Sequence, residues 1–411
     1  MSLTGALKIV GGLLLLLVIL FGLAVTIVPR FLDRIYYRGA VSDHFDGERF
    51  HNPGPEDDTT RPPAGGSRAG FFLRYLTKSD GRPPWPETVA VTPARPPARV
   101  EGEQMLVTWV GHATVLVQSD GLNILTDPIW SDRTGPFGRG PKRVAAPGIK
   151  FEDLPKIDLV LLSHNHYDHF DLPTLKRLWE RDRPLIVTSL GNDAILRGMG
   201  IPARPLDGTT GVQALDWHQT TSLGGYAADG EGYRRGGAFV RVMPVHHWGS
   251  RWFTDRNRAL WSGFLVHLPG GDNIFFAGDT GYGGGEWVRQ AAGFTPYRLA
   301  ILPIGAFRFT PGQMGIGSHM GPVDAVRTFD GLGATTALPV HWGTFRLSFE
   351  GYDTPPKMLD LLMRCTGADP ARFAARGIGM PFEVPPTGAP TRPDLGKLDG
   401  CANSAAVKAM P

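Results

Sequence analysis

A chain of 411 residues is long enough for two or three domains, or for one large sandwich domain with additional segments. Its formal net charge of +3 is too small and too dispersed to indicate a nucleic-acid-binding protein. Hydrophobic residues make up 42% of the chain, as in globular proteins, and 54 glycines and 36 prolines indicate many turns. The two cysteines, Cys365 and Cys401, lie in no motif, so we expect the fold not to depend on a disulfide framework.

The N-terminal region predicts a membrane-spanning helix. Residues 9–28 form an uninterrupted apolar run, which is long enough to cross a bilayer as an α-helix. A cleaved signal peptide is the alternative, with Lys8 as its positive region and a small-residue cleavage site at Ala24. We favour a retained single-pass anchor, because the apolar run continues beyond Ala24. Three arginines follow the run, at positions 30, 34 and 38, and they slightly favour a cytoplasmic location for the rest of the chain.

Residues 39–103 predict an irregular arm. The arm is rich in proline and glycine, a composition that alone would indicate a linker. It also contains apolar stretches at 71–76 and 84–86, which a free linker would expose to water, so we expect it to pack against the main domain. The chain is therefore divided into an N-terminal anchor with its flank (1–38), the Pro/Gly-rich arm (39–103), a main folded domain (104–385) and a C-terminal tail (386–411) that ends loosely.

Within the main domain, the hydrophobic pattern predicts two β-sheets flanked by helices. Strands are expected at 105–110, 114–118, 122–126, 157–163, 185–188, 239–245, 263–268, 273–277, 299–303 and 335–339. Helices are expected at 172–181, 192–198, 286–292, 322–329 and 355–364. The strands first cluster and then alternate with helices, which is typical of sheets covered by helices.

The residues that indicate chemistry follow the apolar run 157–162. His164, His166, Asp168 and His169 have the spacing H-x-H-x-D-H. A buried strand that leads into a tight loop would place the first two side chains on one side and the last two on the other, as two adjoining metal sites require. Imidazole nitrogens and carboxylate oxygens suit zinc or a similar divalent metal. A histidine-rich surface turn is the less favoured alternative, because further histidines and an aspartate follow at the ends of later strands.

This motif after an apolar strand resembles the signature of the metallo-β-lactamase superfamily. Four further stretches resemble its branch of N-acyl-phosphatidylethanolamine-hydrolysing phospholipases D, namely residues 108–114 (TWVGHAT), 125–128 (LTDP), 277–282 (AGDTGY) and 339–345 (PVHWGTF). The resemblance covers about residues 45–350. It implies an α/β fold, the four-layer αββα metallo-β-lactamase sandwich of metal-dependent hydrolases, preceded here by the predicted N-terminal transmembrane helix.

The resemblance implies two Zn²⁺ or similar divalent ions per chain. The first ion would be held by His164, His166 and one histidine of the pair at 246 and 247. His247 is favoured, because it directly precedes Trp248 as in the family pattern, but strand parity alone leaves His246 open. The second ion would be held by three further side chains, and Asp279 would bridge the two ions. These three are Asp168, His169 and His341.

Three more residues are predicted to assist. Asp127 and His112 are expected to orient metal ligands. His319 is expected to bind a phosphate oxygen of the substrate or to protonate the leaving group, and we group it with Asp168 and Asp279 as catalytic. The alternatives are a purely structural His112 and a loop or helix-capping role for His319.

By resemblance, the reaction is phosphodiester hydrolysis of N-acyl-phosphatidylethanolamine or a related membrane phospholipid. A metal-bridging hydroxide would attack phosphorus and yield an N-acylethanolamine and phosphatidic acid. The expected partners are the phospholipid substrate and the bilayer, without nucleic acid, and the family implies a homodimer. Apolar side chains near the motifs are candidates for an acyl groove: Trp248, Trp252, Phe253, Trp261, Phe307, Phe309, Met314 and Met320. A lactonase of the same fold and a non-enzymatic envelope protein with a structural metal site are the alternatives.

Overall fold

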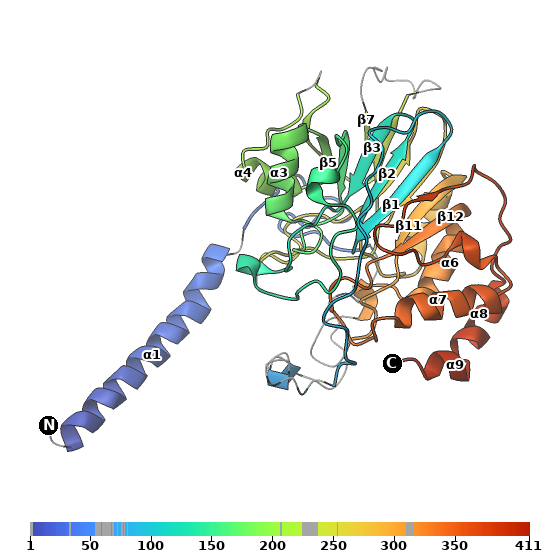
Figure 1. Cartoon of the computed structure of the whole chain (residues 1–411). Coiled ribbons are helices and arrows are strands. Elements are labelled where there is room, and N and C mark those ends of the chain that lie inside the picture. The colour runs from blue at the N-terminus through green and yellow to red at the C-terminus, as the bar shows by residue number, and fades with distance from the viewer. Residues whose placement is uncertain are drawn as a thin grey trace.

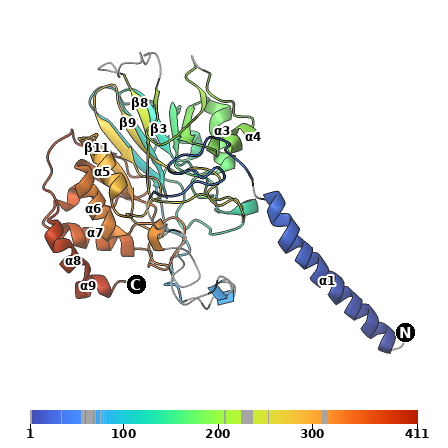
Figure 2. The same ribbon diagram turned by 180° about the vertical axis from the view of Figure 1, so that it is seen from behind.

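The computed structural model describes residues 3–32, 34–53, 59, 67, 70–71, 73–74, 77, 79, 81–205, 208–223, 237–252, 254–309 and 316–411. Two mixed β-sheets lie face to face, helices cover the outer face of each sheet, and helix α1 projects away from the domain (Figures 1 and 2). This is the predicted four-layer αββα arrangement, and the predicted fold class is therefore confirmed.

The first sheet has seven strands in the order β13-β1-β2-β3-β4-β5-β6. Their bounds are β1 (Met105–Gly111), β2 (Thr114–Ser119), β3 (Leu122–Thr126), β4 (Leu159–Leu162), β5 (Leu185–Ser189), β6 (Gly211–Leu215) and β13 (Phe382–Glu383). Strands β13 to β3 pair antiparallel, and β3 to β6 pair parallel. Helices α3 (Leu172–Asp182) and α4 (Asn192–Gly198) lie on its outer face (Figure 1).

The second sheet has six strands in the order β12-β11-β10-β9-β8-β7. Their bounds are β7 (Thr220–Ser222), β8 (Phe239–Met243), β9 (Gly263–His267), β10 (Asn273–Phe276), β11 (Tyr297–Pro303) and β12 (Ala334–Val340). The neighbours β10–β11 and β11–β12 pair parallel, and the other neighbours in this sheet pair antiparallel. Helices α5 (Glu286–Ala292), α6 (Pro322–Leu332) and α7 (Thr354–Cys365) cover this sheet. Short 3-10 turns occur at Pro136–Gly138, Phe151–Asp153, Ile316–Ser318 and Pro370–Arg372.

The packing of strand β4 explains why its sequence is a continuous apolar run. Leu159 and Leu161 point into the core between the sheets, whereas Val160 and Leu162 pack against the layer formed by α3 and α4. A strand that is buried on both faces has no solvent side and needs no polar residue. The motif that follows β4 is therefore held by a strand that is packed on both sides.

Helix α1 (Leu3–Leu32) contains the predicted membrane segment. Its window Leu7–Ala24 has a mean hydropathy of 2.6 and no residue buried against the protein, so by length and composition it can cross a membrane. A signal sequence would meet the same criteria. Farther along, Val89 and Ala94 form β-bridges to Ala145 and Ile149, and the indole of Trp85 donates a hydrogen bond to the Glu350 carbonyl oxygen (3.0 Å). The described parts of the arm thus contact the domain, whereas residues 72, 75 and 76 of the apolar stretch at 71–76 lie outside the described residues.

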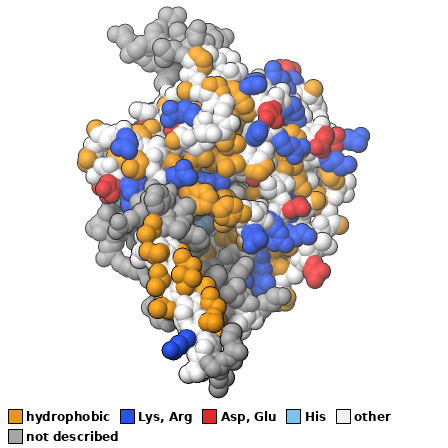
Figure 3. All heavy atoms as spheres, turned by 90° about the vertical axis from the view of Figure 1, so that its left-hand side faces the viewer, with side chains coloured by type: hydrophobic (Ala, Val, Ile, Leu, Met, Phe, Trp, Pro, Cys, Tyr) orange, Lys and Arg blue, Asp and Glu red, His pale blue; other side chains and the backbone are white. Residues whose placement is uncertain are grey.

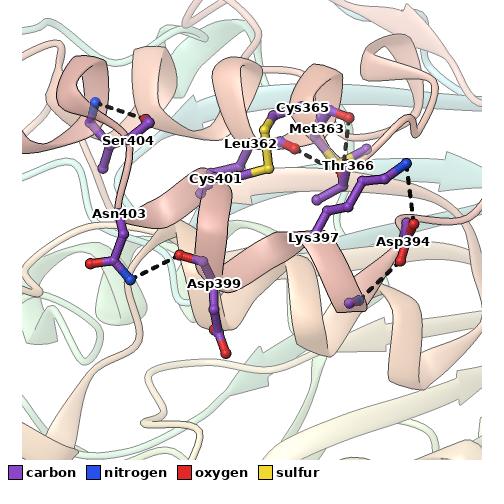
Figure 4. Close-up of a disulfide and its surroundings, with 12 residues drawn as sticks. Leu362, Met363, Cys365, Thr366, Asp394, Lys397, Asp399, Cys401, Asn403 and Ser404 are labelled. Carbon is purple, nitrogen blue, oxygen red and sulfur yellow. Dashed lines mark hydrogen bonds and ion pairs between the residues drawn. A yellow bond between two sulfur atoms is a disulfide. The ribbon is translucent and has the colours of Figure 1, made fainter.

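The C-terminal segment differs from the expected loose tail. Helices α8 (Leu395–Ala402) and α9 (Ala405–Lys408) follow β13, and a disulfide joins Cys365 of α7 to Cys401 of α8 (Figure 4). The two cysteines are 36 residues apart in the sequence, and their pairing depends on how α8 packs against α7. The segment is a helical cover that is covalently tied to the domain.

Candidate metal centre

The predicted ligands come together at one edge of the two sheets. Strands β3 and β4 are parallel neighbours, so the residues that follow them, Asp127 and the 164–169 loop, emerge side by side. In the second sheet, β8, β10 and β12 end at Met243, Phe276 and Val340, and a predicted ligand follows each of them within four residues. Chain segments that are far apart in the sequence therefore deliver their polar side chains to the same place.

The side chains form two adjoining groups that share a boundary at Asp279. Ligand atoms of each group lie within 4.8 Å of one another. The first group is His164, His166, His247 and Asp279, and the second is His112, Asp168, His169 and His341. Asp279 Oδ2 lies 3.0 Å from both His169 Nε2 and His341 Nε2, and 4.0 Å from His164 Nε2. Asp279 thus contacts ligand atoms of both groups, as a bridging carboxylate must.

The arrangement fits divalent metal ions. His169 Nε2, His341 Nε2 and Asp279 Oδ1 are buried and form no hydrogen bond among the described residues, although both nitrogens lie at ion-pair distance from Asp279 Oδ2. Buried polar atoms are nearly always paired, so a cluster of such atoms around a common point indicates a ligand that the protein itself does not supply. Burial lowers the pKa of His166 to about 3, whereas the Asp279 carboxylate outweighs burial at His341 and raises its pKa to about 9, so a cation that bound His341 would displace a proton.

The structure brings His247 to the cluster and leaves His246 outside it. The His247 side chain is fully buried, and its Nδ1 donates a hydrogen bond to the Ser318 carbonyl oxygen at 2.7 Å. Its Nε2 faces the other members of the first group and lies 3.4 Å from His166 Nδ1. His246 pairs through its backbone with Gly281 in a β-bridge, is only partly buried and belongs to neither group of candidate ligands.

Asp127 forms hydrogen bonds to the start and the end of the ligand loop. Its carboxylate accepts hydrogen bonds from His169 Nδ1 (2.6 Å), from the Ser163 backbone N–H (2.8 Å) and from the Ser163 hydroxyl (2.5 Å). The same hydroxyl lies 2.8 Å from His164 Nδ1. Asp127 therefore fixes the ring orientation of one histidine in each half of the motif, one directly and one through Ser163. Sequence reasoning missed Ser163, whose only signal is its position between strand β4 and His164.

Within the second group, His112 contacts Asp168 and His341. Its Nε2 lies 2.9 Å from Asp168 Oδ2, and its ring lies 4.2 Å from the ring of His341. Its backbone is fixed as well, because its N–H donates to the Thr344 hydroxyl (2.8 Å) and its carbonyl oxygen accepts from the His341 N–H (3.0 Å). Burial lowers the pKa of His112 to about 3, so the neutral ring can donate one N–H to Asp168. The geometry is that of a residue that orients Asp168.

His319 lies beside Asp279 in the cluster. Its Nδ1 is 3.7 Å from Asp279 Oδ2, and its ring is 5.0 Å from the ring of His247 and 5.3 Å from that of His341. Burial lowers the pKa of His319 to about 3. A neutral imidazole can form a hydrogen bond with a phosphate oxygen, but it carries no extra proton to give to a leaving group. Both predicted roles of His319, phosphate binding and protonation of the leaving group, stay predictions, and the neutral ring suits the first of them.

The candidate groove residues are only partly in position. Trp248 contacts the His166 ring (4.2 Å between centroids), and Phe309 contacts that of His319 (5.6 Å). Trp261 and Met320 are fully buried in the core, so they cannot line a groove. Phe253 and Met314 lie outside the described residues.

Residues 122–342, more than half of the chain, match the Beta-lactamase superfamily domain. This chain belongs to the beta-lactamase superfamily. It is 34% identical over 265 residues to an uncharacterized protein of Mycobacterium tuberculosis, and the match covers 64% of each chain. It is 33% identical over 257 residues to N-acyl-phosphatidylethanolamine-hydrolyzing phospholipase D 1 of Caenorhabditis elegans, covering 62% of this chain and 68% of the relative.

Solved structures of the superfamily fold also resemble the chain. An isothiocyanate hydrolase from Delia radicum gut bacteria superposes with a TM-score of 0.50 at 19% identity, over 68% of this chain and 98% of that one. At this identity the likeness shows the superfamily fold alone. The recognised family and fold are thus confirmed, and the two ligand groups lie within a domain of the beta-lactamase superfamily.

Proposed function

We propose that the protein is a metal-dependent hydrolase with two Zn²⁺ or similar ions that cleaves a membrane phosphodiester. The proposed substrate is N-acyl-phosphatidylethanolamine or a related phospholipid, and the products are an N-acylethanolamine and phosphatidic acid. The observation that carries the proposal is the position of Asp279 between two adjoining groups of ligands. The name of the relative from Caenorhabditis elegans supports the substrate class.

Each side chain of the proposed site would have one of three roles: metal binding, orientation of a metal ligand, or substrate binding. Two divalent ions, when bound, would lower the pKa of a shared water and neutralise the negative oxygen of a phosphodiester. His164, His166 and His247 would hold one ion, and Asp168, His169 and His341 the other, with Asp279 between them. Asp127, Ser163 and His112 would keep these ligands in orientation through the hydrogen bonds described above. His319 would contact a phosphate oxygen of the substrate.

Replacing His319 with alanine should therefore slow hydrolysis and leave the metal content unchanged. A hydrogen bond to a charged group contributes about 1.5–3 kcal/mol, so the rate should fall by about 10- to 150-fold. Metal analysis and turnover of the same sample check this. Turnover at the wild-type rate would remove His319 from the site, and loss of one metal equivalent would make it a ligand instead.

Several features near the end of α1 support a lipid substrate. Phe137 is 85% exposed at the tip of a loop and contacts Trp252 (5.9 Å between ring centroids). The Trp252 backbone N–H donates to the Asp255 carboxylate. This carboxylate also accepts a hydrogen bond from Tyr36, four residues beyond the end of α1. On the face from which α1 projects, hydrophobic side chains gather beside the helix, and Lys and Arg side chains flank them (Figure 3). With α1 in a bilayer, this face would lie against the membrane surface.

The side of the membrane is part of the proposal. The arginines that follow α1 favour the cytoplasmic side, whereas the disulfide between Cys365 and Cys401 favours an oxidising compartment. We infer the oxidising side, because disulfides rarely persist in the cytosol and large domains cross membranes largely regardless of their charge. Alkylation of protein from intact cells should find no free thiol, and two alkylated cysteines would place the domain in the cytoplasm.

The decisive experiment incubates the full chain, purified in detergent and loaded with Zn²⁺, with mixed phospholipids and, separately, with lactones. Mass spectrometry should detect phosphatidic acid together with N-acylethanolamine, and the His247→Ala variant should produce neither. Lactone hydrolysis without lipid cleavage would favour the lactonase alternative. A single metal equivalent per chain without any hydrolysis would favour a structural metal site, which is closed and mononuclear.

A further inference from the structure

The segment 34–53, between α1 and the arm, packs firmly against the domain although it precedes the family match at 122–342. Phe45 and Phe50 are each 1% exposed and belong to the main core. Their ring centroids are 4.7 Å apart, and Tyr37 packs edge-on against Phe45 at 5.1 Å. Removal of these two large apolar side chains from water stabilises the packed segment, so they anchor it at a fixed place.

Asn52, at the end of this segment, binds the backbone of His247. Its Nδ2–H donates to the His247 carbonyl oxygen at 2.8 Å, and its Oδ1 accepts from the His247 backbone N–H at 3.2 Å. The same Oδ1 accepts from the Trp261 indole N–H at 3.2 Å. Asn52 is 3% exposed. His247 lies beyond the last residue of β8, so the carboxamide takes the place of a neighbouring strand for this one residue.

The same segment also reaches the H-x-H-x-D-H loop. The Tyr36 hydroxyl donates to Asp255 Oδ2 at 2.8 Å, and Asp255 Oδ1 accepts from the Arg251 backbone N–H at 3.1 Å. The buried Arg251 guanidinium then donates to two carbonyl oxygens, that of Asn165 within the loop (3.1 Å) and that of Phe170 directly after it (2.9 Å). The two contacts of segment 34–53 therefore lead to His247 on one side and to the motif on the other.

We propose that Asn52 is a positioning residue of the metal centre, so that a residue upstream of the matched range 122–342 sets the metal affinity. The inference rests on the proposed metal site. Two contacts determine where His247 Nε2 points: Ser318 fixes the ring through Nδ1, and Asn52 fixes the backbone through both of its polar groups. Without Asn52, the buried His247 N–H and carbonyl oxygen lose their hydrogen-bond partner. The backbone position from which the imidazole extends is then no longer fixed.

The test compares the full-length Asn52→Ala variant with an Asn123→Ala control, both loaded with Zn²⁺ alone. Asn123 is also a buried asparagine, and its side chain bonds to Gln118 and to the carbonyl oxygens of Ala98 and Lys156. It lies at the start of β3, whereas the metal centre lies beyond the end of that strand. Both variants should melt at lower temperature. Only Asn52→Ala should transfer zinc to a chelator faster, with an affinity about 10- to 100-fold weaker.

Equal zinc transfer by the two variants would overturn the proposal, because Asn52 would then act on stability alone. If Asn52→Ala fails to fold, Asn52→Asp replaces it. The aspartate keeps the size and the acceptor oxygen but loses the N–H that reaches the His247 carbonyl oxygen, so zinc should still be released faster than from the wild type. Wild-type release from Asn52→Asp would also count against the proposal. No lipid is present in these measurements, so a failure of the proposed lipid hydrolysis would leave their outcome unaffected.

Discussion

Replacing His247 with alanine should abolish detectable hydrolysis and remove about one of two bound metal ions, whereas replacing His246 should change neither. The two residues are neighbours of the same type, but only His247 is fully buried beside His164 and His166. Loss of a residue that merely orients a ligand costs about 10- to 100-fold in metal affinity or activity, so loss of a ligand should exceed this range.

This pair of variants is informative because each controls for the other. Metal analysis and turnover should be measured on both proteins after confirming that they melt within a few degrees of each other. If His246→Ala lost activity as strongly as His247→Ala, the ligand would be undecided. If His246→Ala lost activity and His247→Ala kept it, the orientation of these two histidines in the structure would be wrong.

Removing the metals with a chelator should stop turnover completely and lower the melting temperature. The buried nitrogens of His169 and His341 and the Asp279 carboxylate would then face one another without the cations that we expect between them. A ligand present at 1,000 times its dissociation constant stabilises the folded state by about 4 kcal/mol, which the stripped protein would lose.

Adding Zn²⁺ back should restore both turnover and melting temperature, and titration should reach its end at about two equivalents. Thermal melts and activity measured on the same stripped sample distinguish the effect of zinc on stability from its effect on turnover. Full activity after exhaustive chelation, with no metal left by elemental analysis, would exclude the proposed metal-dependent reaction.

Much of the fold could be predicted because its central strands are buried on both faces. Strand β4 has a continuous apolar sequence, β3 and β11 are mostly apolar and almost fully buried, and the predicted and observed positions of all three overlap closely. Strands β6, β7 and β13 were missed, because they are short, lie at sheet edges and carry partly exposed side chains without clear alternation. The C-terminal helices were missed for a similar reason: α8 contains two glycines, and much of its surface faces solvent.

The proximity of the candidate ligands was predictable from topology, because parallel neighbouring strands end at the same edge of a sheet. The choice of His247 over His246 rested on the family pattern, and the structure places the two accordingly. Contacts such as those of Ser163, Asn52 and the Ser318 carbonyl oxygen were not predictable. They depend on which loops pack together in three dimensions, and residues of these types are common in any loop.

The packing of segment 34–53 decides where this protein can be shortened. A soluble form that started at residue 104, just before β1, would keep every strand but lack Asn52 together with Phe45 and Phe50, and it would open the core beside Trp261. Cutting between Leu32 and Tyr36 instead would remove the apolar helix and leave every contact of the segment intact. A signal peptidase that cut near Ala24 would have the same effect, so an anchored form and a released form of the chain would share one active structure.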